Sequence, residues 1–455
     1  MIVISAMVGS GIFKKIAPMS AELHSSWLIL AAWLIAGLIT LFASASNAEV
    51  AALIAEPGGQ YVYFKKMYGD AFAFLYGWSC FAVIQSASIA SIAYVFSESL
   101  NSVIPLPHFS PGIESISLFN IFYPFQSFGI KGVTIFIIIF LTAANYFGVI
   151  IGGSLSNFFT VLKLFGIFLI IIFIFLWSSG SLSNLFITAD TLPKSYSSPL
   201  GITGAFFAAM LAAFWAYDGW NNIGYLGGEI KNAKRNIPLS LYLGVIITIL
   251  IYLIINIAFL YVFPIPEMIK VFNTPDSIAA IEVLRSFMGN AGVMLISILI
   301  MISTFATTNG TVLASSRLYF AMSKDELFFR YASTCHKKYK TPSSSLIIQG
   351  IWSCLLVLSG TFDQLTDMLM FSNFIFYGAG VLGVFVLRKK MKDEIRRFRV
   401  FGYPYIPAIA LIFFAAIFII TIIQRPRDAG IGSALMLIGL PFYFVWKRKK
   451  DKLTV

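Results

Sequence analysis

The sequence predicts an all-α integral membrane protein with twelve transmembrane helices. Of its 455 residues, 58% are hydrophobic and only 11% are charged, whereas soluble globular proteins carry about 25% charged residues. Several apolar runs approach or exceed the roughly 20 residues that cross a bilayer as a helix. Lysine and arginine gather in alternate connections between these runs, as they do when those connections face the cytoplasm.

The twelve predicted helices follow from the apolar runs and from the small or weakly polar residues that extend them. We place them at residues 1–19, 27–54, 70–100, 129–148, 156–178, 200–227, 237–263, 289–321, 343–360, 366–388, 402–424 and 430–446. Pro57 ends the second helix, residues 60–68 form a short amphipathic segment, and Pro238 suits the first turn of the seventh helix. No stretch is long and polar enough for a soluble domain, so residues 1–455 form one transmembrane domain.

The formal net charge of +12 reflects membrane topology rather than nucleic-acid binding. With the N-terminus on the inner side, most of the 32 lysines and arginines fall in inner connections and in the C-terminal tail. We therefore expect a multi-pass protein of the cell membrane with both termini in the cytoplasm. The three cysteines have no metal-ligand spacing, and no hydrolase, kinase or zinc signature is present. The sequence predicts neither an enzyme nor a metal or cofactor site.

The first predicted helix contains Gly9 and Gly11 with Ser10 between them. Each glycine costs a helix about 1 kcal/mol and permits backbone conformations that other residues resist. Taken alone, the stretch is more typical of close packing of two helices at small residues; it also suits a helix that unwinds in the membrane, where freed amides could hold a small anion. Only about 12 Å of helix precedes Gly9, against a half-bilayer of about 15 Å, so we expect a truncated N-terminus.

The sixth predicted helix contains a comparable stretch, residues 214–222, which read FWAYDGWNN. An acidic residue in a transmembrane helix is costly and is a functional candidate by default. Asp218 is followed directly by Gly219, which indicates a second break in a helix. Two interrupted helices in corresponding positions of two halves are typical of transporters with inverted repeats. Freed N–H groups suit a carboxylate, and freed carbonyls with Asp218 suit a cation, so an α-amino acid would satisfy both sets.

Three further polar residues lie within predicted helices. Lys163 lies roughly 10 Å into the fifth helix, so it either reaches the membrane surface by snorkelling or serves a function. Ser303 and Thr307 are four residues apart in the eighth helix and share a face. They either bond the carbonyls of their own helix or take part in a site.

Several of these motifs, taken in order, resemble those of a known family. Residues 8–13 (VGSGIF) resemble the first-helix motif of the amino acid–polyamine–organocation superfamily, and residues 215–221 (WAYDGWN) and 228–232 (GEIKN) are similar to its L-type amino acid transporter branch. Further matches are Glu49, residues 57–59 (PGG), Tyr61, Thr160 with Lys163, residues 309–310 (NG) and residues 315–317 (SSR). The resemblance covers residues 1–445 and is to a bacterial member of that branch.

The resemblance implies a LeuT-type fold with alternating access to a site in the middle of the membrane. Two five-helix repeats of inverted topology, residues 1–180 and 200–388, would be followed by two more helices in residues 402–446. Helices 1 and 6 would be unwound in mid-membrane.

The resemblance also places the substrate-binding residues at the two glycine-containing stretches. The N–H groups of residues 10–12 would hold the substrate carboxylate, and the carbonyls of Met7, Trp215 and Asp218 would hold its amino group. Trp215 would also cover the bound substrate. The implied set is Met7, Gly9, Ser10, Gly11, Ile12, Trp215, Ala216, Tyr217, Asp218 and Gly219.

The lysine at position 163 resembles one that stands where sodium binds in related transporters. Its ammonium would join the first helix near Gly9 to the eighth helix, with Ser303 and Thr307 as partners. The resemblance therefore implies transport without sodium.

Two features depart from the family pattern. Eukaryotic L-type members join a partner glycoprotein through a cysteine between helices three and four, but residues 101–128 contain no cysteine. We therefore expect no disulfide-linked partner glycoprotein. Lys14 and Lys15 directly follow Phe13; they either attract anionic solutes or pair with Glu22.

The expected function is a sodium-independent exchanger or facilitator of neutral L-amino acids, with cationic substrates left open because Asp218 could accept a positive side chain. One alternative is a proton-coupled amino acid or polyamine symporter in which Lys163 cycles its proton. An alternative of a different class is a non-transporting membrane sensor of amino acids. The sequence does not decide the substrate side chain, the coupling mode or the oligomeric state.

Overall fold

The computed structural model describes residues 1–455 except 55, 57, 119–121, 149–152, 190, 198, 227–229 and 454–455. Side chains of residues 153–157, 194, 226 and 449–453 are also outside the description. Of the sequence motifs, Pro57, Gly228 and Glu229 therefore lie outside the described residues. In the part of the chain that is described, all regular structure is helical and there is no β-strand, which agrees with the predicted all-α class.

The helices occupy nearly all the predicted ranges. The α-helices are α1 (Ile2–Met7), α2 (Gly11–Lys14), α3 (Ile16–Leu23), α4 (Ser26–Leu53), α5 (Gln60–Tyr68), α6 (Asp70–Ser79), α7 (Gln85–Asn101), α8 (Pro111–Glu114), α9 (Phe128–Tyr146), α10 (Gly153–Trp177), α11 (Gly201–Tyr217), α12 (Ala233–Val262), α13 (Ile265–Asn273), α14 (Ala279–Lys324), α15 (Ser343–Ser359), α16 (Phe362–Lys390), α17 (Tyr405–Gln424), α18 (Pro426–Leu437) and α19 (Gly439–Leu453). A π-helical turn, η1 (Cys80–Ile84), joins α6 to α7, and a 3₁₀ segment, η4 (Trp220–Leu226), follows α11.

Ten helical stretches within the described residues are long and apolar enough to cross a membrane. Two predicted helices are not among them: α15 has 17 residues, and the first predicted helix is divided into α1, α2 and α3. The predicted start of the seventh helix was wrong. Asn232 precedes α12, which begins at Ala233, so Pro238 lies inside this helix rather than in its first turn. The chain is a multi-pass membrane protein.

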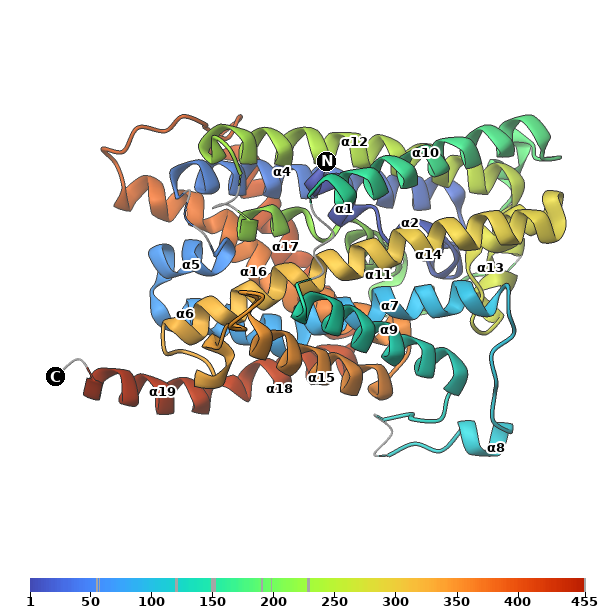
Figure 1. Ribbon diagram of the computed structural model, residues 1–455. Helices are drawn as coiled ribbons and strands as arrows, with labels where there is room; N and C mark the ends of the chain where they lie inside the picture. Colours follow the sequence, from blue (N-terminus) through green and yellow to red (C-terminus); the bar gives the residue numbers. More distant parts are fainter. Residues whose placement is uncertain are drawn as a thin grey trace.

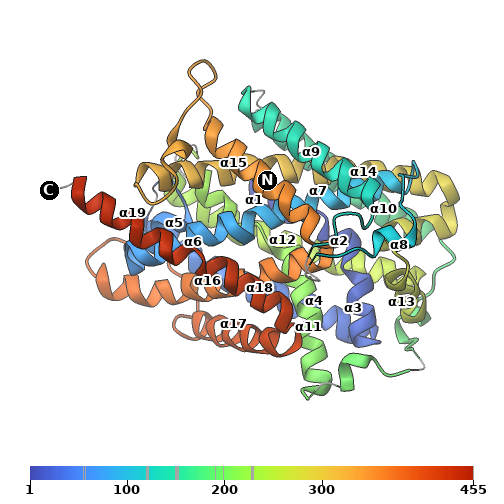
Figure 2. The same cartoon turned by 90° about the horizontal axis from the view of Figure 1, so that it is seen from below.

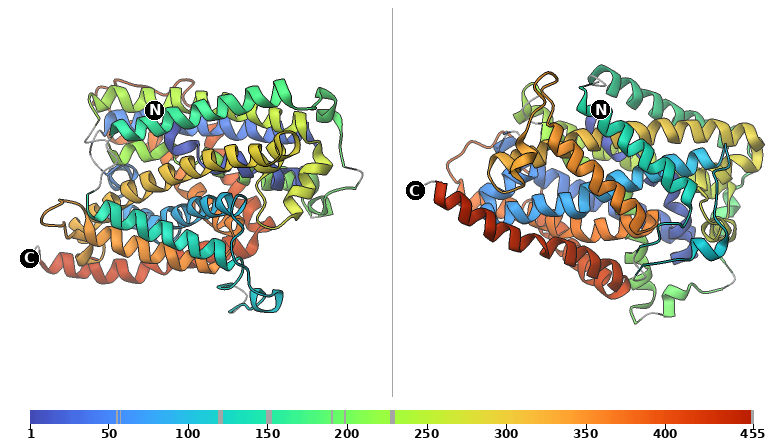
Figure 3. Two further views of the ribbon diagram at one scale, coloured as in Figure 1. Left: turned by 45° about the vertical axis from the view of Figure 1, so that its right-hand side comes forward. Right: turned by 60° about the horizontal axis from the view of Figure 1, so that its bottom comes forward.

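The helices run roughly side by side across Figure 1, from α10 and α12 at one edge of the bundle to α15 and α18 at the other. The same order is kept in the left view of Figure 3. The short helix α1 lies inside the bundle and contacts α10, α12 and α14, whereas α2 contacts α11 and α14. The view from below places α17 and α19 at the outer edge, away from α1 (Figure 2). The start of the chain is therefore surrounded by later helices.

Two helix breaks meet at this interior position. The first break, residues 8–10, separates α1 from α2. The second break, residues 218–219, separates α11 from η4; Asp218 is extended (φ −66°, ψ 161°), and Gly219 has φ +93°. A positive φ is readily adopted only by glycine, so this residue permits the turn. Gly11 lets the breaks touch, because a Cβ atom added there would lie only 2.6 Å from the Cα atom of Ala216.

Candidate functional site

A cavity of about 20 Å³ lies between the two breaks. Residues in and beside the two breaks line it together with residues of α7 and α14. They are Ala6, Met7, Gly9, Ser10, Gly11, Ser88, Ile92, Trp215, Asp218, Gly219, Asn222, Thr307 and Thr311. A cavity must exceed roughly 10–15 Å³ to hold one water molecule. The space is therefore closed down to the size of a water molecule in this conformation.

Two polar atoms in the walls of this cavity are buried without a partner. Neither the Ser10 hydroxyl nor the Trp215 Nε1–H group has a hydrogen-bond partner among the described residues. A buried polar group without a hydrogen bond costs about 1–3 kcal/mol, and such groups are rare in native proteins. The pair therefore points to a polar ligand between the breaks.

The first break is held by Lys163 of α10, which is completely buried. Its Nζ atom donates to the Ser5 carbonyl at 2.7 Å and to the Val8 carbonyl at 2.8 Å, and it lies 3.4 Å from the Thr307 hydroxyl oxygen. Thr307 donates its own hydrogen to the Ser303 carbonyl at 2.9 Å, so its lone pairs are free to accept. The three N–H bonds of an ammonium group match these three acceptors. The side chain points into the bundle, not toward the membrane surface.

Ser303 takes part in the same network through a longer hydrogen bond. Its hydroxyl donates to the Val8 carbonyl at 3.3 Å, and that carbonyl also accepts from Lys163. Residues of α10 and α14 thus converge on one carbonyl of the first break.

The second break presents a carboxylate rather than an ammonium. Asp218 Oδ1 accepts a hydrogen bond from Asn373 Nδ2 at 3.1 Å and another from the Tyr377 hydroxyl, both on α16. From α12, the Tyr252 hydroxyl lies 2.8 Å from the carbonyl oxygens of both Met7 and Ala216. One hydroxyl thus lies within hydrogen-bond distance of both interrupted helices, and the Met7 carbonyl also accepts from the Gly9 N–H group at 2.8 Å.

Aromatic rings cover the cavity where α2 meets the start of α16. The rings of Trp215 and Phe362 meet edge to face with centroids 6.1 Å apart. The Nζ atoms of Lys14 and Lys15 each lie 4.6 Å from the Phe362 centroid. Such cation–π contacts contribute about 0.5–2 kcal/mol, depending on how far water is excluded. We call the two rings and the two lysines the lid.

The lid lysines are paired with carboxylates, but not with the one that the sequence suggested. Lys14 forms an ion pair with Glu98 of α7, and Lys15 donates to Asp363 Oδ1 at 2.6 Å. The proposed pairing with Glu22 was wrong, because Glu22 accepts from Arg425 Nη2 at 2.7 Å. The partners that the lysines do have lie 84 and 348 positions away in the chain, where no local pattern could identify them.

Polar contacts also join the helices at the other end of the bundle. Arg388 Nε and Nη2 donate to the two carboxylate oxygens of Glu49 at 2.9 and 2.8 Å. Lys65 of α5 donates to Asp325 Oδ2 at 2.6 Å, and the Tyr61 hydroxyl donates to the same atom at 2.9 Å. Burial, together with the charge of Asp325, raises the pKa of Tyr61 well above its usual value, so this hydroxyl stays a donor.

Most of the predicted binding residues meet at the cavity. Met7, Gly9, Ser10, Gly11, Trp215, Asp218, Gly219 and Thr307 line it. Three others do not: Ile12 is buried beside it, Ala216 packs under Gly11, and Tyr217 donates to the Trp33 carbonyl at 3.2 Å. Lys163 and Ser303 act on the Val8 carbonyl behind the cavity.

Sequence reasoning missed several residues of the site. Ser88, Ile92, Asn222 and Thr311 line the cavity, and Tyr252, Asn373 and Tyr377 hold the breaks. Thr311 had a usable signal, because it lies four residues after Thr307 on one helix face. Among the described residues, no group of three or more His, Cys, Asp or Glu side chains could hold a metal ion.

Comparison with known proteins places the chain in a family. The family model for amino acid permeases matches residues 1–445. The chain belongs to the amino acid permease family. This permease is 30% identical over 453 residues to the serine/threonine exchanger SteT of Bacillus subtilis (strain 168), covering 99% of the permease and 95% of that protein.

Two mammalian relatives are also similar over nearly the whole permease. The b(0,+)-type amino acid transporter 1 of Mus musculus is 26% identical over 453 residues, which cover 98% of the permease and 86% of that protein. The large neutral amino acids transporter small subunit 2 of Homo sapiens is 28% identical over 453 residues, which cover 98% of the permease and 79% of that protein. The predicted superfamily is thereby confirmed, and a large neutral amino acids transporter is among the similar proteins.

Proposed function

We propose that this permease exchanges neutral L-amino acids across the cell membrane by alternating access, without sodium, and binds them in the cavity between the two helix breaks. The observation that carries the proposal is the pair of unpartnered polar groups, Ser10 Oγ and Trp215 Nε1, in a cavity that has a carboxylate on one wall. An α-amino acid offers both a carboxylate and an ammonium group to such walls.

The two ends of the amino acid fit different walls. The carboxylate would lie against the first break, where the Ser10 hydroxyl and the N–H groups at the start of α2 are available as donors, because the first N–H groups of a helix have no carbonyl partner within it. The ammonium would lie toward Asp218. Since the cavity measures only about 20 Å³, the substrate enters when α2 and α11 separate at the lid.

Sodium independence rests on what Lys163 contacts. Its three acceptors are two backbone carbonyls and one hydroxyl, and oxygen atoms of these kinds are the ligands that hard cations prefer. An ammonium that already binds them takes the place of a metal cation. The proposed transport cycle therefore needs no sodium to hold the first break together.

The neutral substrate class is proposed from the relatives, whose names specify serine and threonine or large neutral amino acids. Cationic substrates are a less favourable match, because Asp218 already accepts two hydrogen bonds from α16. Exchange is proposed because SteT is named as an exchanger.

Membrane topology and repeat structure are part of the same proposal. The breaks separate α1 from α2 and α11 from η4, which are corresponding positions if residues 1–180 and 200–388 are inverted repeats. The lysine- and arginine-rich connections would face the cytoplasm together with both termini. The lid would then face the outside.

The test uses purified protein in liposomes preloaded with unlabelled L-serine in sodium-free buffer. Labelled L-serine outside should accumulate faster than in liposomes that contain no internal amino acid, and protein-free liposomes give the background. Absence of uptake by the folded protein, for a panel of L-amino acids and under sodium or proton gradients, would contradict the proposal. Uptake driven only by a proton gradient would favour the symport alternative.

A further inference from the structure

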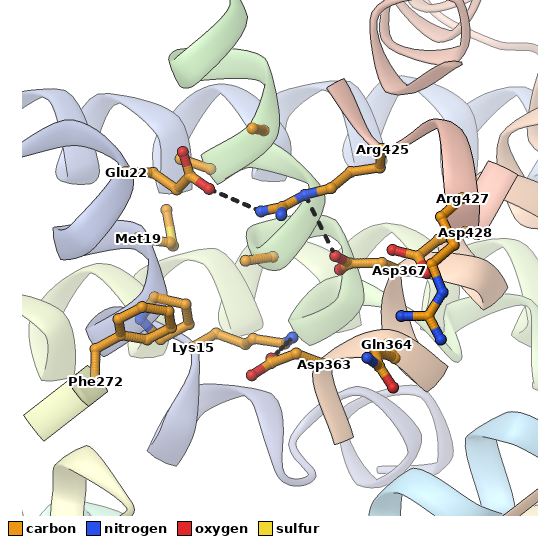
Figure 4. Close-up of a pocket in the computed structure, with 14 residues that line it drawn as sticks. Lys15, Met19, Glu22, Phe272, Asp363, Gln364, Asp367, Arg425, Arg427 and Asp428 are labelled. Carbon is orange, nitrogen blue, oxygen red and sulfur yellow. Dashed lines mark hydrogen bonds and ion pairs between the residues drawn. The ribbon is translucent and has the colours of Figure 1, made fainter. Parts of the chain in front are cut away.

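A second cavity, of about 290 Å³, lies beyond the lid, and we call it the Arg425 cavity. Figure 4 shows its charged side chains, which come from α3, from the start of α16 and from the junction of α17 with α18. Its volume is close to the roughly 300 Å³ at which small-molecule pockets begin. It is therefore far larger than the closed cavity between the breaks.

Charges of both signs face one another across the Arg425 cavity. Asp363 and Asp367 are four residues apart on α16 and so share a face. The Arg425 guanidinium lies between Glu22 of α3 and Asp367 (Figure 4). A ligand with one positive and one negative group would find an opposite charge for each.

The charges in this cavity differ in how completely they are paired. Lys15 donates two hydrogen bonds, to Asp363 at 2.6 Å and to the Thr366 hydroxyl at 2.8 Å. The Nε atom of Arg425, in contrast, is buried without a hydrogen bond to any described residue. Its contact with Asp367 Oδ2 measures 3.7 Å, which is too long for a hydrogen bond. Arg425 and Asp367 thus keep binding capacity for a further charged group.

The cavity also lies next to the covered substrate site. Asp363 lines the cavity and holds Lys15. Lys15 in turn lies over the Phe362 ring, and that ring contacts Trp215, which lines the inner cavity. A continuous series of side-chain contacts thus links the walls of the two spaces.

We infer that the Arg425 cavity is a second binding site for a zwitterionic amino acid, occupied before the lid opens. The inference rests on the proposed transport function. The guanidinium of Arg425 receives the carboxylate, for which its planar fork offers two parallel N–H bonds, and Asp367 receives the ammonium. Occupancy here places the substrate beside Phe362 when the lid separates.

The test is equilibrium binding of labelled L-serine, up to millimolar concentrations, to the purified full-length protein. Gly9→Val is used to fill the inner cavity, because a Cβ at Gly9 meets the Thr307 Cγ2 atom at an ordinary 3.5 Å and further methyl groups would extend into the cavity. The wild type should bind two serines per chain, and Gly9→Val should bind one. In the Gly9→Val background, Arg425→Gln and Asp367→Asn should each abolish the remaining binding.

Arg285→Gln in the same background is the matched control. Arg285 is a half-exposed arginine on α14 whose ion pair with Glu282 lies outside both cavities, so its loss should leave the remaining binding unchanged. Thermal unfolding verifies that each variant is folded. If Arg425→Gln does not fold, Arg425→Lys replaces it. The lysine keeps the positive charge but lacks the planar fork of the guanidinium, so binding should weaken about tenfold.

Three results would overturn the inference. They are a wild type that binds a single serine, a Gly9→Val protein that binds none, and remaining binding that survives both cavity substitutions. Each of them is compatible with normal transport by the wild type, so the proposed function would stand. A folded wild type that neither binds nor transports any amino acid would remove both proposals together.

Discussion

The two helix breaks differ in the sign of the buried charge beside them. At the first break, the carbonyls of Ser5 and Val8 receive hydrogen bonds from the buried ammonium of Lys163. At the second break, the carboxylate of Asp218 receives hydrogen bonds from Asn373 and Tyr377. A break in a transmembrane helix frees polar backbone groups that lipid cannot satisfy. Here a charge placed deep in the bundle, with its own partners, accompanies each break.

The difference indicates which charge the protein already pairs and which charge can pair with a ligand. Lys163 has three acceptors for its three N–H bonds and does not line the cavity. Asp218 does line it, and its partners are neutral donors on α16 rather than a cation. A substrate ammonium would supply the positive charge that Asp218 lacks. The charge at the first break is thus paired by the protein itself, and the charge at the second would be paired by the substrate ammonium.

Removal of the Lys163 charge should have the largest effect. Lys163→Met keeps most of the side-chain volume but removes the ammonium donor from two buried carbonyls, and hydrogen bonds to charged groups contribute about 1.5–3 kcal/mol each. Serine exchange per folded protein should fall by about 100-fold or more.

Lys131→Met is the matched control for that substitution. Lys131 is also a buried lysine of a membrane-spanning helix, α9, but it donates to the Tyr123 carbonyl, away from both breaks. Its exchange rate per folded protein should stay near that of the wild type. Equal losses in the two variants would mean that burial of a lysine, and not its position at the first break, matters.

The next largest effect distinguishes Gly9, in the first break, from Gly11, which begins α2 directly after it. At Gly11, a Cβ would lie 2.6 Å from the Ala216 Cα atom, a backbone atom that cannot rotate away. At Gly9, it would lie 3.5 Å from a side-chain carbon of Thr307. Gly11→Ala should therefore destabilise the fold by about 2 kcal/mol, whereas Gly9→Ala should leave the melting temperature nearly unchanged and weaken serine binding. Thermal unfolding and serine binding measure both; equal melting temperatures would show that the breaks do not touch.

Asp218→Asn should weaken serine binding by about tenfold, because the isosteric amide keeps the shape but loses the charge that faces the substrate ammonium. Tyr377→Phe removes only a hydrogen bond to Asp218 and should weaken binding less. Equilibrium binding of labelled serine to both variants tests this order. Unchanged affinity in Asp218→Asn would place the ammonium elsewhere.

Ser303→Ala should have the smallest effect. Its 3.3 Å hydrogen bond reaches a Val8 carbonyl that keeps Lys163 at 2.8 Å, so the carbonyl remains satisfied. Exchange should slow by about threefold or less, the equivalent of a weak neutral hydrogen bond. A loss as large as that of Lys163→Met would make Ser303, and not the ammonium, the main support of the first break.

The sequence predicted those features of the site whose residues are energetically unfavourable in a transmembrane helix. Glycine pairs, an acidic residue and a lysine stand out in apolar runs, so both breaks and Lys163 could be predicted from their energetic cost alone. In the first glycine stretch, Gly11 packs closely against Ala216 and Gly9 lines the cavity, so close packing is confirmed at Gly11 and the binding of an anion stays a prediction.

The other site residues could not be predicted from the sequence, because their positions depend on how each helix is rotated and on contacts between distant parts of the chain. Tyr252 lies in a long apolar run where a tyrosine has no distinguishing pattern, yet its hydroxyl reaches both breaks. Asn373 and Tyr377 are four apart, but no local signal indicates that their face turns toward Asp218. The partners of Lys14 and Lys15 were predicted wrongly for the same reason. Glu22 is the only carboxylate near them in the sequence, but it pairs with Arg425 instead.

In the proposed function, the ammonium of Lys163 does at the first break what a metal cation would otherwise do. The most direct measurement is the initial rate of labelled serine exchange in liposomes with sodium or with choline at equal ionic strength on both sides. Equal rates are expected, because the oxygen atoms around Lys163 are already bound. A rate that falls to background without sodium would contradict the claim.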